Sequence, residues 1–317
     1  MPSNGWLDCR GRYRSLAMTF CGNSSGDPVA RRGEFCYHNA MRHNILVVND
    51  DGVDALGVHK LAEALSEVGD VYVCSPHVQQ SASGHGITIG KLVYFENLPF
   101  PEAKHAISME GTPADCVKMG LELYRKHGVE IDMVFSGFNH GMNLGTDTLY
   151  SGTVSAAIEG ALCGLPAAAM SISSNLSFQR TPEHFEGAME LAKEIARSEM
   201  FSKETTDNAR EPDINFIHER HVILSVNVPD TPLSEIKGVK VCPLSYRVYD
   251  EWFQERTDGE GRKGYHYSGA PRVVGEAEAD ESDIVANRLG YATVTPLRFD
   301  LTDRIGLEIW RKVDWGL

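Results

Sequence analysis

Two adjacent aspartates, Asp50 and Asp51, lie between Asn49 and Gly52, immediately after a short aliphatic run from Ile45 to Val48. Neighbouring carboxylates repel each other, and on a regular strand they would point to opposite faces. A divalent cation that neutralises both would explain their position at a strand end, and oxygen ligands suit Mg²⁺ or Mn²⁺ better than zinc. The alternative is an Asp-Gly turn in which Asp51 caps the next helix.

A four-residue pattern repeats three times after a second hydrophobic run that ends at Phe135. It begins at Gly137 and reads Gly-Phe-Asn-His, Gly-Met-Asn-Leu, Gly-Thr-Asp-Thr. Gly, Asn and Asp tolerate left-handed backbone and form side-chain turns, so the repeat is a rigid loop, a binding site, or both for different members. Asn139 is the Asn nearest the expected strand end, which makes its amide oxygen a candidate metal ligand. Asn143 and Asn49 are candidate phosphate contacts.

The repeat leads into Ser151, Gly152 and Thr153, directly before a helix expected over residues 154–162. Helix N-termini present unpaired N–H groups and the positive end of the helix dipole, and hydroxyl groups add further donors. These three residues are therefore a candidate phosphate site. An ordinary Ser/Thr helix cap is the alternative.

A loop after the strand expected at 71–74 carries Ser81, Ser83 and His85. Ser81 is a candidate hydroxyl ligand of the metal and His85 a candidate proton donor, although both residue types are also common in purely structural turns. Neither serine lies in a Gly-x-Ser-x-Gly elbow, which argues against a serine hydrolase of that class.

The segments that must position these residues alternate between strand and helix character, which predicts parallel βαβ units. Strands are expected at 45–48, 71–74, 131–135, 167–172, 222–228 and 291–295, and helices at 58–68, 114–126, 154–162, 182–197 and 284–289. The predicted fold is α/β, a doubly wound and mostly parallel Rossmann-like sheet. Such sheets bind ligands beyond the carboxyl ends of their strands, which is where the polar motifs lie.

The remaining regions are assigned by composition. Residues 1–40 lack a hydrophobic period and a secretory signal, so we expect a poorly ordered extension, and Met41 is a candidate initiator. Residues 41–301 form the expected catalytic domain. It includes a polar surface insertion at 198–221 and a β-rich arm around 240–270 whose aromatic residues suit a subunit interface. Residues 302–317 form a C-terminal tail.

Charge and cysteine content narrow the function classes. The 30 basic and 44 acidic residues give a net charge of −14, which argues against nucleic-acid binding. No apolar run approaches the ~20 residues that span a bilayer, so no membrane partner is expected. The seven cysteines include no Cys-x-x-Cys pair, which excludes zinc-ribbon and redox motifs of that kind and favours a reducing, cytoplasmic location.

Four ordered motifs resemble the SurE family of stationary-phase survival proteins, which are metal-dependent 5′-nucleotidases. The motifs are Asn49-Asp-Asp-Gly52, Ser81-Ala-Ser-Gly-His85, Gly111-Thr-Pro-Ala-Asp-Cys116, and Ser136-Gly-Phe-Asn139 continuing through Tyr150 to Ser155. The resemblance extends from about residue 41 to about residue 301. It implies hydrolysis of nucleoside 5′-monophosphates, one Mg²⁺ or Mn²⁺ ion per subunit, and a homodimer or homotetramer formed through the C-terminal arm.

The resemblance also implies roles for individual residues. The metal ligands would be Asp50, Asp51, Ser81 and Asn139, and the phosphate cradle would lie at Gly152, Thr153 and neighbouring N–H groups. Within this assignment Asp50, Asp51 and His85 are the candidate catalytic residues. Neither the residues nor the resemblance decides whether water or a carboxylate attacks phosphorus, or which nucleotide is preferred.

The motifs also bear on three alternative functions. A haloacid-dehalogenase-like phosphatase needs Asp-x-Asp, but here Asn49 lies two residues before Asp51 and Gly52 lies two residues after Asp50, so that class is excluded. A hydrolase of short polyphosphate or of general phosphomonoesters is compatible with the same motifs. A nucleotide sensor without turnover is also compatible, because a metal and phosphate cradle can bind a ligand without hydrolysing it.

Overall fold

The computed structural model describes residues 42–173, 182–198, 201, 222–250, 252–267, 270–274 and 281–315, with the backbone alone at 270–274. All of these residues belong to the second of two units into which the chain divides, residues 1–40 and 41–317. The expected extension and most of the expected polar insertion lie outside the described residues.

The elements of the described chain alternate between strand and helix over the first two thirds of its length. This part contains β1 (His43–Val48), α1 (Leu56–Ser66), β2 (Gly69–Pro76), β3 (Phe95–Leu98), β4 (His105–Met109), α2 (Pro113–Lys126), β5 (Met133–His140), the 3₁₀ helix η1 (Gly145–Leu149), α3 (Gly152–Leu162), β6 (Ala167–Ser173), α4 (Glu186–Arg197) and β7 (Val222–Pro229). The remainder contains the 3₁₀ helix η4 (Leu233–Glu235), β8 (Val239–Val241), β9 (Tyr246–Asp250), β10 (Phe253–Thr257), β11 (Lys263–Tyr267), β12 (Ala270–Val274), α6 (Asp283–Arg288), β13 (Ala292–Arg298) and α7 (Arg304–Trp310).

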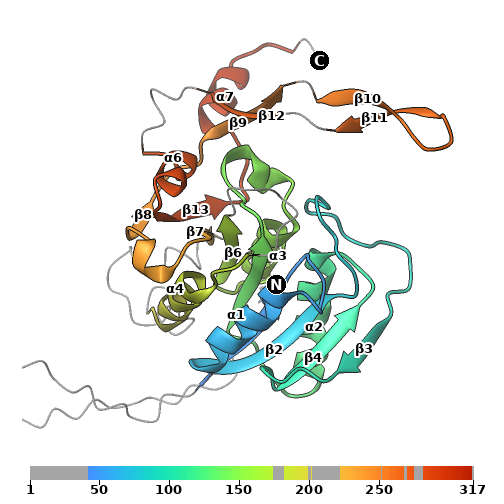
Figure 1. The fold of residues 1–317 in the computed structure, drawn as a ribbon, viewed down its shortest axis with the longest axis vertical. Coiled ribbons are helices and arrows are strands. Elements are labelled where there is room, and N and C mark those ends of the chain that lie inside the picture. Colours follow the sequence, from blue (N-terminus) through green and yellow to red (C-terminus); the bar gives the residue numbers. More distant parts are fainter. Residues whose placement is uncertain are drawn as a thin grey trace, which may run out of the picture. The chain divides into compact units, whose positions relative to one another are not determined.

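Nine strands form one mixed sheet in the order β3-β4-β2-β1-β5-β6-β7-β13-β8 (Figure 1). The six strands from β4 to β7 in this order are parallel, whereas β3 and β13 run antiparallel to their neighbours β4 and β7. The carboxyl ends of the parallel strands therefore meet at one edge of the sheet. The predicted α/β, mostly parallel fold is confirmed.

Helices cover both faces of the sheet, and the central strand β1 shows why. Ile45 and Val47 pack into a hydrophobic cluster with α1 and α4, while Leu46 and Val48 pack into a second cluster with α2 and α3. A strand that is buried on both faces must be apolar at every position rather than at alternate ones. The continuous aliphatic run before the aspartates is therefore the consequence of a two-sided core.

The structure corrects the predicted end of one strand. Strand β5 does not stop at Phe135 but continues to His140, so the first unit of the four-residue repeat belongs to the sheet. The pairing with β6 shifts between Ser136 and Asn139. Gly137 lies at this irregularity with φ of +133°, and a Cβ there would meet the Met170 carbonyl oxygen at 2.1 Å. The sequence predicts this glycine to lie in a loop, but in the structure it lies within β5 and permits the close approach of β6.

Smaller differences concern short or polar elements. The edge strands β3 and β8 and the strand β4 beside β3 were not predicted, and α4 begins at Glu186 rather than at residue 182. Strand β3 is largely exposed, so it lacks the hydrophobic pattern on which the prediction depended. The expected C-terminal tail contains helix α7.

The expected β-rich arm consists of two small antiparallel sheets, β9 with β12 and β10 with β11. Five of its six Phe, Tyr and Trp side chains are exposed, namely Tyr246, Trp252, Phe253, Tyr265 and Tyr267, whereas Tyr249 is half-buried. Exposed aromatic residues in such number are unusual on a surface without a partner.

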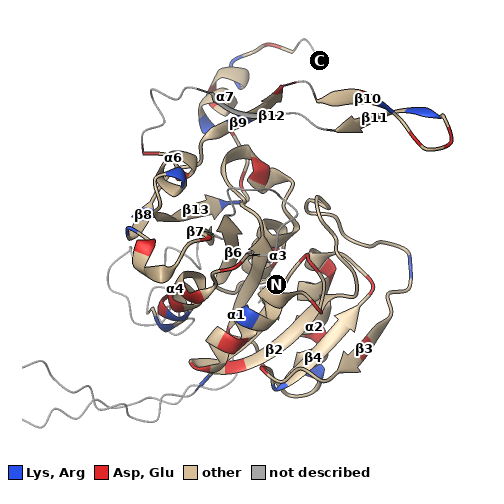
Figure 2. Cartoon of the chain, in the orientation of Figure 1, with Lys and Arg blue, Asp and Glu red and all other residues tan. Residues whose placement is uncertain are grey.

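The described residues also show how charge is distributed along the chain and which cysteines are free. Lys and Arg are scattered among Asp and Glu rather than gathered on one element (Figure 2). None of the described helices is long and apolar enough to cross a membrane. Cys74, Cys116, Cys163 and Cys242 are free thiols, and all except Cys163 are buried.

Candidate active site

Asp50 lies at the carboxyl edge of the sheet, directly after β1, and is 5% exposed. Its Oδ1 accepts a hydrogen bond of 2.5 Å from the Thr153 hydroxyl at the start of α3. Burial raises the pKa of the Asp50 carboxyl to about 6, the hydrogen bond from Thr153 opposes this, and the negative charge of Asp51 adds to it. A carboxyl group with these neighbours gains strongly from a nearby positive charge.

Asp51 is held by the last residue of β5 and by the loop after β2. Its Oδ2 accepts from the His140 backbone N–H at 3.0 Å, and its Oδ1 accepts from Gln79 Nε2 at 3.1 Å. Helix α1 instead has Ala55 at its N-cap, without a side-chain cap. The alternative in which Asp51 caps this helix is therefore wrong, and the carboxylate faces the edge of the sheet.

The structure brings the other two predicted ligands to the same edge. Asn139 directly precedes His140, whose N–H binds Asp51. The Asn139 amide nitrogen donates to the Gly141 carbonyl at 2.9 Å, which directs the amide oxygen away from that contact. Ser81 is exposed and follows Gln80, whose N–H donates to the Asp50 carbonyl at 2.7 Å. All four predicted ligands thus belong to one group of contacting segments.

Asn49 is fully buried beside the aspartates. Its Nδ2 donates to the Gly52 carbonyl at 2.7 Å, whereas its Oδ1 has no hydrogen-bond partner. Buried polar atoms are nearly always paired, so an unpaired oxygen here indicates a position where a donor or a cation would bind. The phosphate contact of Asn49 stays a prediction, because its amide nitrogen already binds Gly52 and an oxygen acceptor does not by itself bind a phosphate.

The N-terminus of α3 lies against Asp50. Ser151 caps the helix by accepting from the Val154 N–H at 3.0 Å, which confirms the cap interpretation of this serine. A Cβ at Gly152 would approach Asp50 Oδ2 to 2.8 Å, so only glycine fits between the helix and the carboxylate. The first turn of the helix therefore reaches the carboxyl edge of the sheet beside Asp50, where its N–H groups could face a phosphate.

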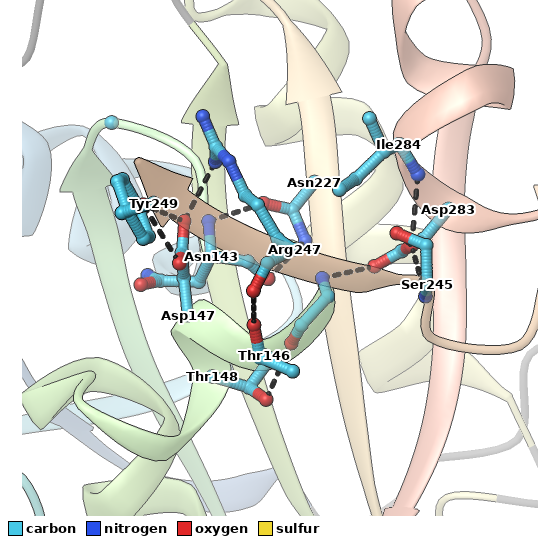
Figure 3. Close-up of polar contacts among 12 residues, drawn as sticks. Asn143, Thr146, Asp147, Thr148, Asn227, Ser245, Arg247, Tyr249, Asp283 and Ile284 are labelled. Carbon is cyan, nitrogen blue, oxygen red and sulfur yellow. Dashed lines mark hydrogen bonds and ion pairs between the residues drawn. The ribbon is translucent and has the colours of Figure 1, made fainter. Parts of the chain in front are cut away.

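Asn143, the Asn of the second repeat, has its amide nitrogen turned into the sheet. Its Nδ2 donates to Ser171 Oγ at 2.9 Å, and its backbone N–H donates to Asn227 Oδ1 at 2.8 Å. Asn227 Nδ2 returns a bond to the Asn143 carbonyl at 3.1 Å (Figure 3). These contacts fix the loop between β5 and η1 to β7.

Asp147, the acidic residue of the third repeat, joins this loop to the arm. Arg247 of β9 lies 2.6 Å from its Oδ2, and the Tyr249 hydroxyl donates to both carboxylate oxygens at 2.8 Å (Figure 3). The side chains of Asp147 and Arg247 are only 13% and 9% exposed. Burial, together with the bond to Asp147, raises the pKa of Tyr249 above its ordinary value, so the phenol stays a donor.

The same loop is fastened at a third point by a buried carboxylate. Asp283 Oδ2 accepts from the Gly145 N–H at 2.7 Å, and its Oδ1 accepts from the N–H of Ser245 at 2.9 Å and of Ile284 at 2.8 Å (Figure 3). Sequence reasoning missed Asp283, Arg247 and Asn227. Their partners are far away in the sequence, and no local pattern marks them.

His85 pairs with a residue that sequence reasoning also missed. Its Nε2 lies 2.9 Å from Oε2 of Glu159 on α3, whose side chain is 5% exposed. Glu159 Oε1 lies 3.0 Å from Lys118 Nζ. A polar residue on a helix of small and apolar residues is the signal that could have identified Glu159, because a buried carboxylate requires partners.

The donors at the edge of the sheet fit a hard cation. The described residues include no group of three or more His, Cys, Asp or Glu side chains that could hold a metal. Two carboxylates, supplemented by amide and hydroxyl oxygens and water, are instead the kind of ligand set that Mg²⁺ accepts. The unpaired Asn49 Oδ1 and the raised pKa of Asp50 both indicate a place for positive charge.

The chain is similar in sequence to known proteins. The family described as "Survival protein SurE" matches residues 45–251. A protein named 5′-nucleotidase SurE from Caldanaerobacter subterraneus subsp. tengcongensis is 38% identical over 262 residues, which cover 82% of this chain and 93% of that protein. One of the same name from Alkaliphilus metalliredigens is 39% identical over 259 residues, 81% of this chain and 93% of that protein.

A solved structure is also similar. The crystal structure of the SurE protein from Aquifex aeolicus superimposes with a TM-score of 0.66 at 32% identity, covering 84% of this chain and 97% of that one.

Proposed function

This chain belongs to the SurE family, and we propose that it hydrolyses nucleoside 5′-monophosphates to a nucleoside and inorganic phosphate with the help of a divalent cation. The observation that carries the proposal is the contact between two halves of one site. The Asp50 carboxylate accepts from Thr153 and leaves room only for glycine at position 152, so a cation edge adjoins a helix N-terminus. A metal-dependent phosphomonoesterase can use the cation and the helix N-terminus together to hold the phosphoryl group.

Asp50, Asp51, Ser81 and Asn139 would hold the cation, with Mg²⁺ or Mn²⁺ preferred for an all-oxygen set. When bound, the cation supplies positive charge to the phosphoryl oxygens and lowers the pKa of coordinated water. Thr153 keeps Asp50 oriented through its hydroxyl group, and the His140 N–H does the same for Asp51. Both carboxylates are thus held in place before any ligand arrives.

The phosphoryl group would rest on the first turn of α3. Ser151 uses its hydroxyl group for the helix cap and Thr153 uses its own for Asp50, so we assign the phosphate contacts to backbone N–H groups at Gly152 and Thr153. We propose that Asn49, which directly precedes Asp50, and Asn143, which lies four residues after Asn139, form walls of this site. The net charge of −14, and the scattering of Lys and Arg among Asp and Glu along the described chain, support a small nucleotide substrate rather than a nucleic acid.

We further propose that the protein forms a homodimer or homotetramer through the arm and acts in the cytoplasm. The exposed aromatic residues of β9 to β11 support the first statement, because such side chains are enriched in interface cores. The free thiols of the described cysteines support the second, because a reducing compartment preserves them.

The test is a substrate panel with controlled metal content. Purified protein would be freed of metal with a chelator and assayed for phosphate release from AMP, GMP, UMP and short polyphosphate with Mg²⁺, Mn²⁺ or no metal. We expect release from nucleoside monophosphates that depends on added metal. Tight binding of AMP without phosphate release would identify a nucleotide sensor instead, and full activity in chelator would remove the metal from the proposal.

A further inference from the structure

We propose that Glu159 is a positioning residue that holds the His85 ring with Nε2–H toward α3 and Nδ1 toward the phosphoester, so that Nδ1 protonates the leaving 5′-oxygen. The inference rests on the proposed 5′-nucleotidase function and deepens it. It assigns the atom of His85 that carries the proton and the group that orients it.

The loop that carries His85 is fastened on both sides of this residue. The Gly84 N–H donates to the Tyr150 carbonyl at 3.1 Å, and the Gly86 carbonyl accepts from the Thr112 hydroxyl at 2.7 Å. Two residues later, Thr88 donates through its backbone N–H and its hydroxyl to Asp115 of the α2 capping box, at 3.0 and 2.6 Å. The backbone at His85 is therefore held from both sides, which leaves the side-chain torsions as its main freedom.

Glu159 removes this remaining freedom. A carboxylate only accepts hydrogen bonds, so the 2.9 Å contact requires the hydrogen on Nε2 of His85. Among the residues that the structure describes, Nδ1 has no hydrogen-bond partner. In a neutral ring Nδ1 is then the basic nitrogen, and in a protonated ring it is a donor without a partner. Either state makes Nδ1 the nitrogen available to a ligand.

The position of the pair relates it to the phosphate site. Glu159 lies seven residues after Gly152, about two helical turns further along the same face of α3. Helical side chains lean toward the helix N-terminus, so the carboxylate reaches back toward the first turn. The Gly84 N–H also binds the carbonyl of Tyr150, the residue before the Ser151 cap. His85 is therefore anchored beside the helix end to which we assign the phosphoryl group.

The chemistry requires such a donor because the nucleoside leaves as an alkoxide. When the bond between phosphorus and the 5′-oxygen breaks, that oxygen keeps the electron pair and takes the proton from Nδ1. The oxygen of a water molecule forms the new bond to phosphorus, and the proton that this water loses restores the imidazolium. The products are the nucleoside and inorganic phosphate, so atoms and charge balance. The buried negative charge of Glu159 stabilises the imidazolium between turnovers.

Leaving-group dependence separates this role from a structural one. A nucleoside is a poor leaving group that needs a proton, whereas 4-nitrophenolate leaves without one. Wild type, Glu159→Gln and His85→Asn would be assayed with AMP and 4-nitrophenyl phosphate at saturating Mn²⁺. The matched control is Lys118→Met, which breaks the other ion pair of the same carboxylate at 3.0 Å and leaves His85 in place.

We expect Glu159→Gln to lower kcat for AMP at least about 20-fold and His85→Asn at least about 100-fold, within the range of general acid catalysis. Turnover of 4-nitrophenyl phosphate should stay within about fivefold in both variants, and Lys118→Met should change both substrates by less than about threefold. Equal losses on the two esters, or unchanged AMP turnover in either variant, would overturn the proposal.

Nitrogen-15 chemical shifts give a second readout that does not need a folded Glu159 variant. In the wild-type protein the neutral His85 ring should be the Nε2–H tautomer, and an Nδ1–H tautomer would overturn the assignment. A wild type that hydrolyses neither ester would instead refute the proposed function, so the two failures are distinguishable.

Discussion

Replacement of Asp50 by Asn should make the metal-free protein more stable at neutral pH while it removes activity. Asp50 is 5% exposed, and burial raises the pKa of its carboxyl to about 6, with the charge of Asp51 acting in the same direction. The folded state thus holds a proton on Asp50 more tightly than the unfolded chain does. An Asn side chain keeps an oxygen that accepts from Thr153 but carries no charge.

The magnitude follows from the pKa difference. A rise from 3.8 to about 6 spans about two pKa units, and each unit corresponds to about 1.4 kcal/mol. Ionised Asp50 therefore costs the metal-free folded state about 3 kcal/mol. Because the folded pKa is the higher one, the protonated carboxyl stabilises the fold fully below pH 3.8. This contribution is lost as the pH rises through about 6.

Urea unfolding in chelator at pH 4, 6 and 8 measures the effect. We expect Asp50→Asn to exceed wild type by about 2 to 3 kcal/mol at pH 8, with a gap that narrows toward pH 4. Added Mn²⁺ should stabilise the wild type more than the variant, because ligand binding to the folded state raises stability by mass action. Turnover of AMP should fall at least about a hundredfold in the variant.

Asp115→Asn is the control of opposite sign. Burial tends to raise the pKa of Asp115, but hydrogen bonds from Thr88 and Thr112 outweigh it and lower the pKa. Its ionised form stabilises the fold above the unfolded pKa, and this contribution disappears as the pH falls through the folded value. Asp115→Asn should therefore be less stable than wild type at pH 8. If Asp50→Asn gains nothing at pH 8, or gains as much at pH 4, the electrostatic argument is wrong.

Three further outcomes test the site and the arm. Asp51→Asn should lower AMP turnover at least about a hundredfold and raise the Mn²⁺ concentration needed for half activity; normal turnover would remove Asp51 from the metal site. Asp147→Asn should destabilise the protein by about 3 kcal/mol in urea unfolding because it leaves Arg247 buried without its charge partner, whereas a loss below about 1 kcal/mol would show that the pair is solvated. Replacing Trp252 and Phe253 together by Ser should shift light-scattering mass to smaller species, and an unchanged mass would exclude these residues from an interface.

The core of the fold and the grouping of the polar residues at one edge of the sheet follow from local sequence patterns. An aliphatic run without alternation predicts a strand covered on both faces, and β1 is such a strand. Parallel strands bring their carboxyl ends to one edge, so Asp50, Asp51 and Asn139 could be placed together without coordinates. The start of α2, expected at residue 114 and observed at Pro113, also depends on neighbours in the sequence, because a capping box needs residues only three positions apart.

Residues that occupy equivalent places in the repeats have different partners in the folded protein. The Asn and Asp residues of the three repeats look alike in sequence, yet Asn139 lies at the end of β5 and binds the Gly141 carbonyl, Asn143 binds Asn227, and Asp147 binds Arg247. Those last two partners are 84 and 100 residues away from the repeat. Hydrophobic periodicity and turn chemistry describe neighbours along the chain, so they carry no information about such contacts.

The two adjacent aspartates also differ in their burial. Both carboxylates follow the same strand, but Thr153 and the close approach of Gly152 enclose Asp50. Asp51 instead contacts Gln79 in the loop after β2 and His140 at the end of β5. The pKa of Asp50 and the orientation of His85 by Glu159 depend on desolvation and on α3 packing beside these segments. Desolvation is a property of the assembled layers, because it depends on which segments exclude water from a side chain rather than on the residues beside it in the sequence.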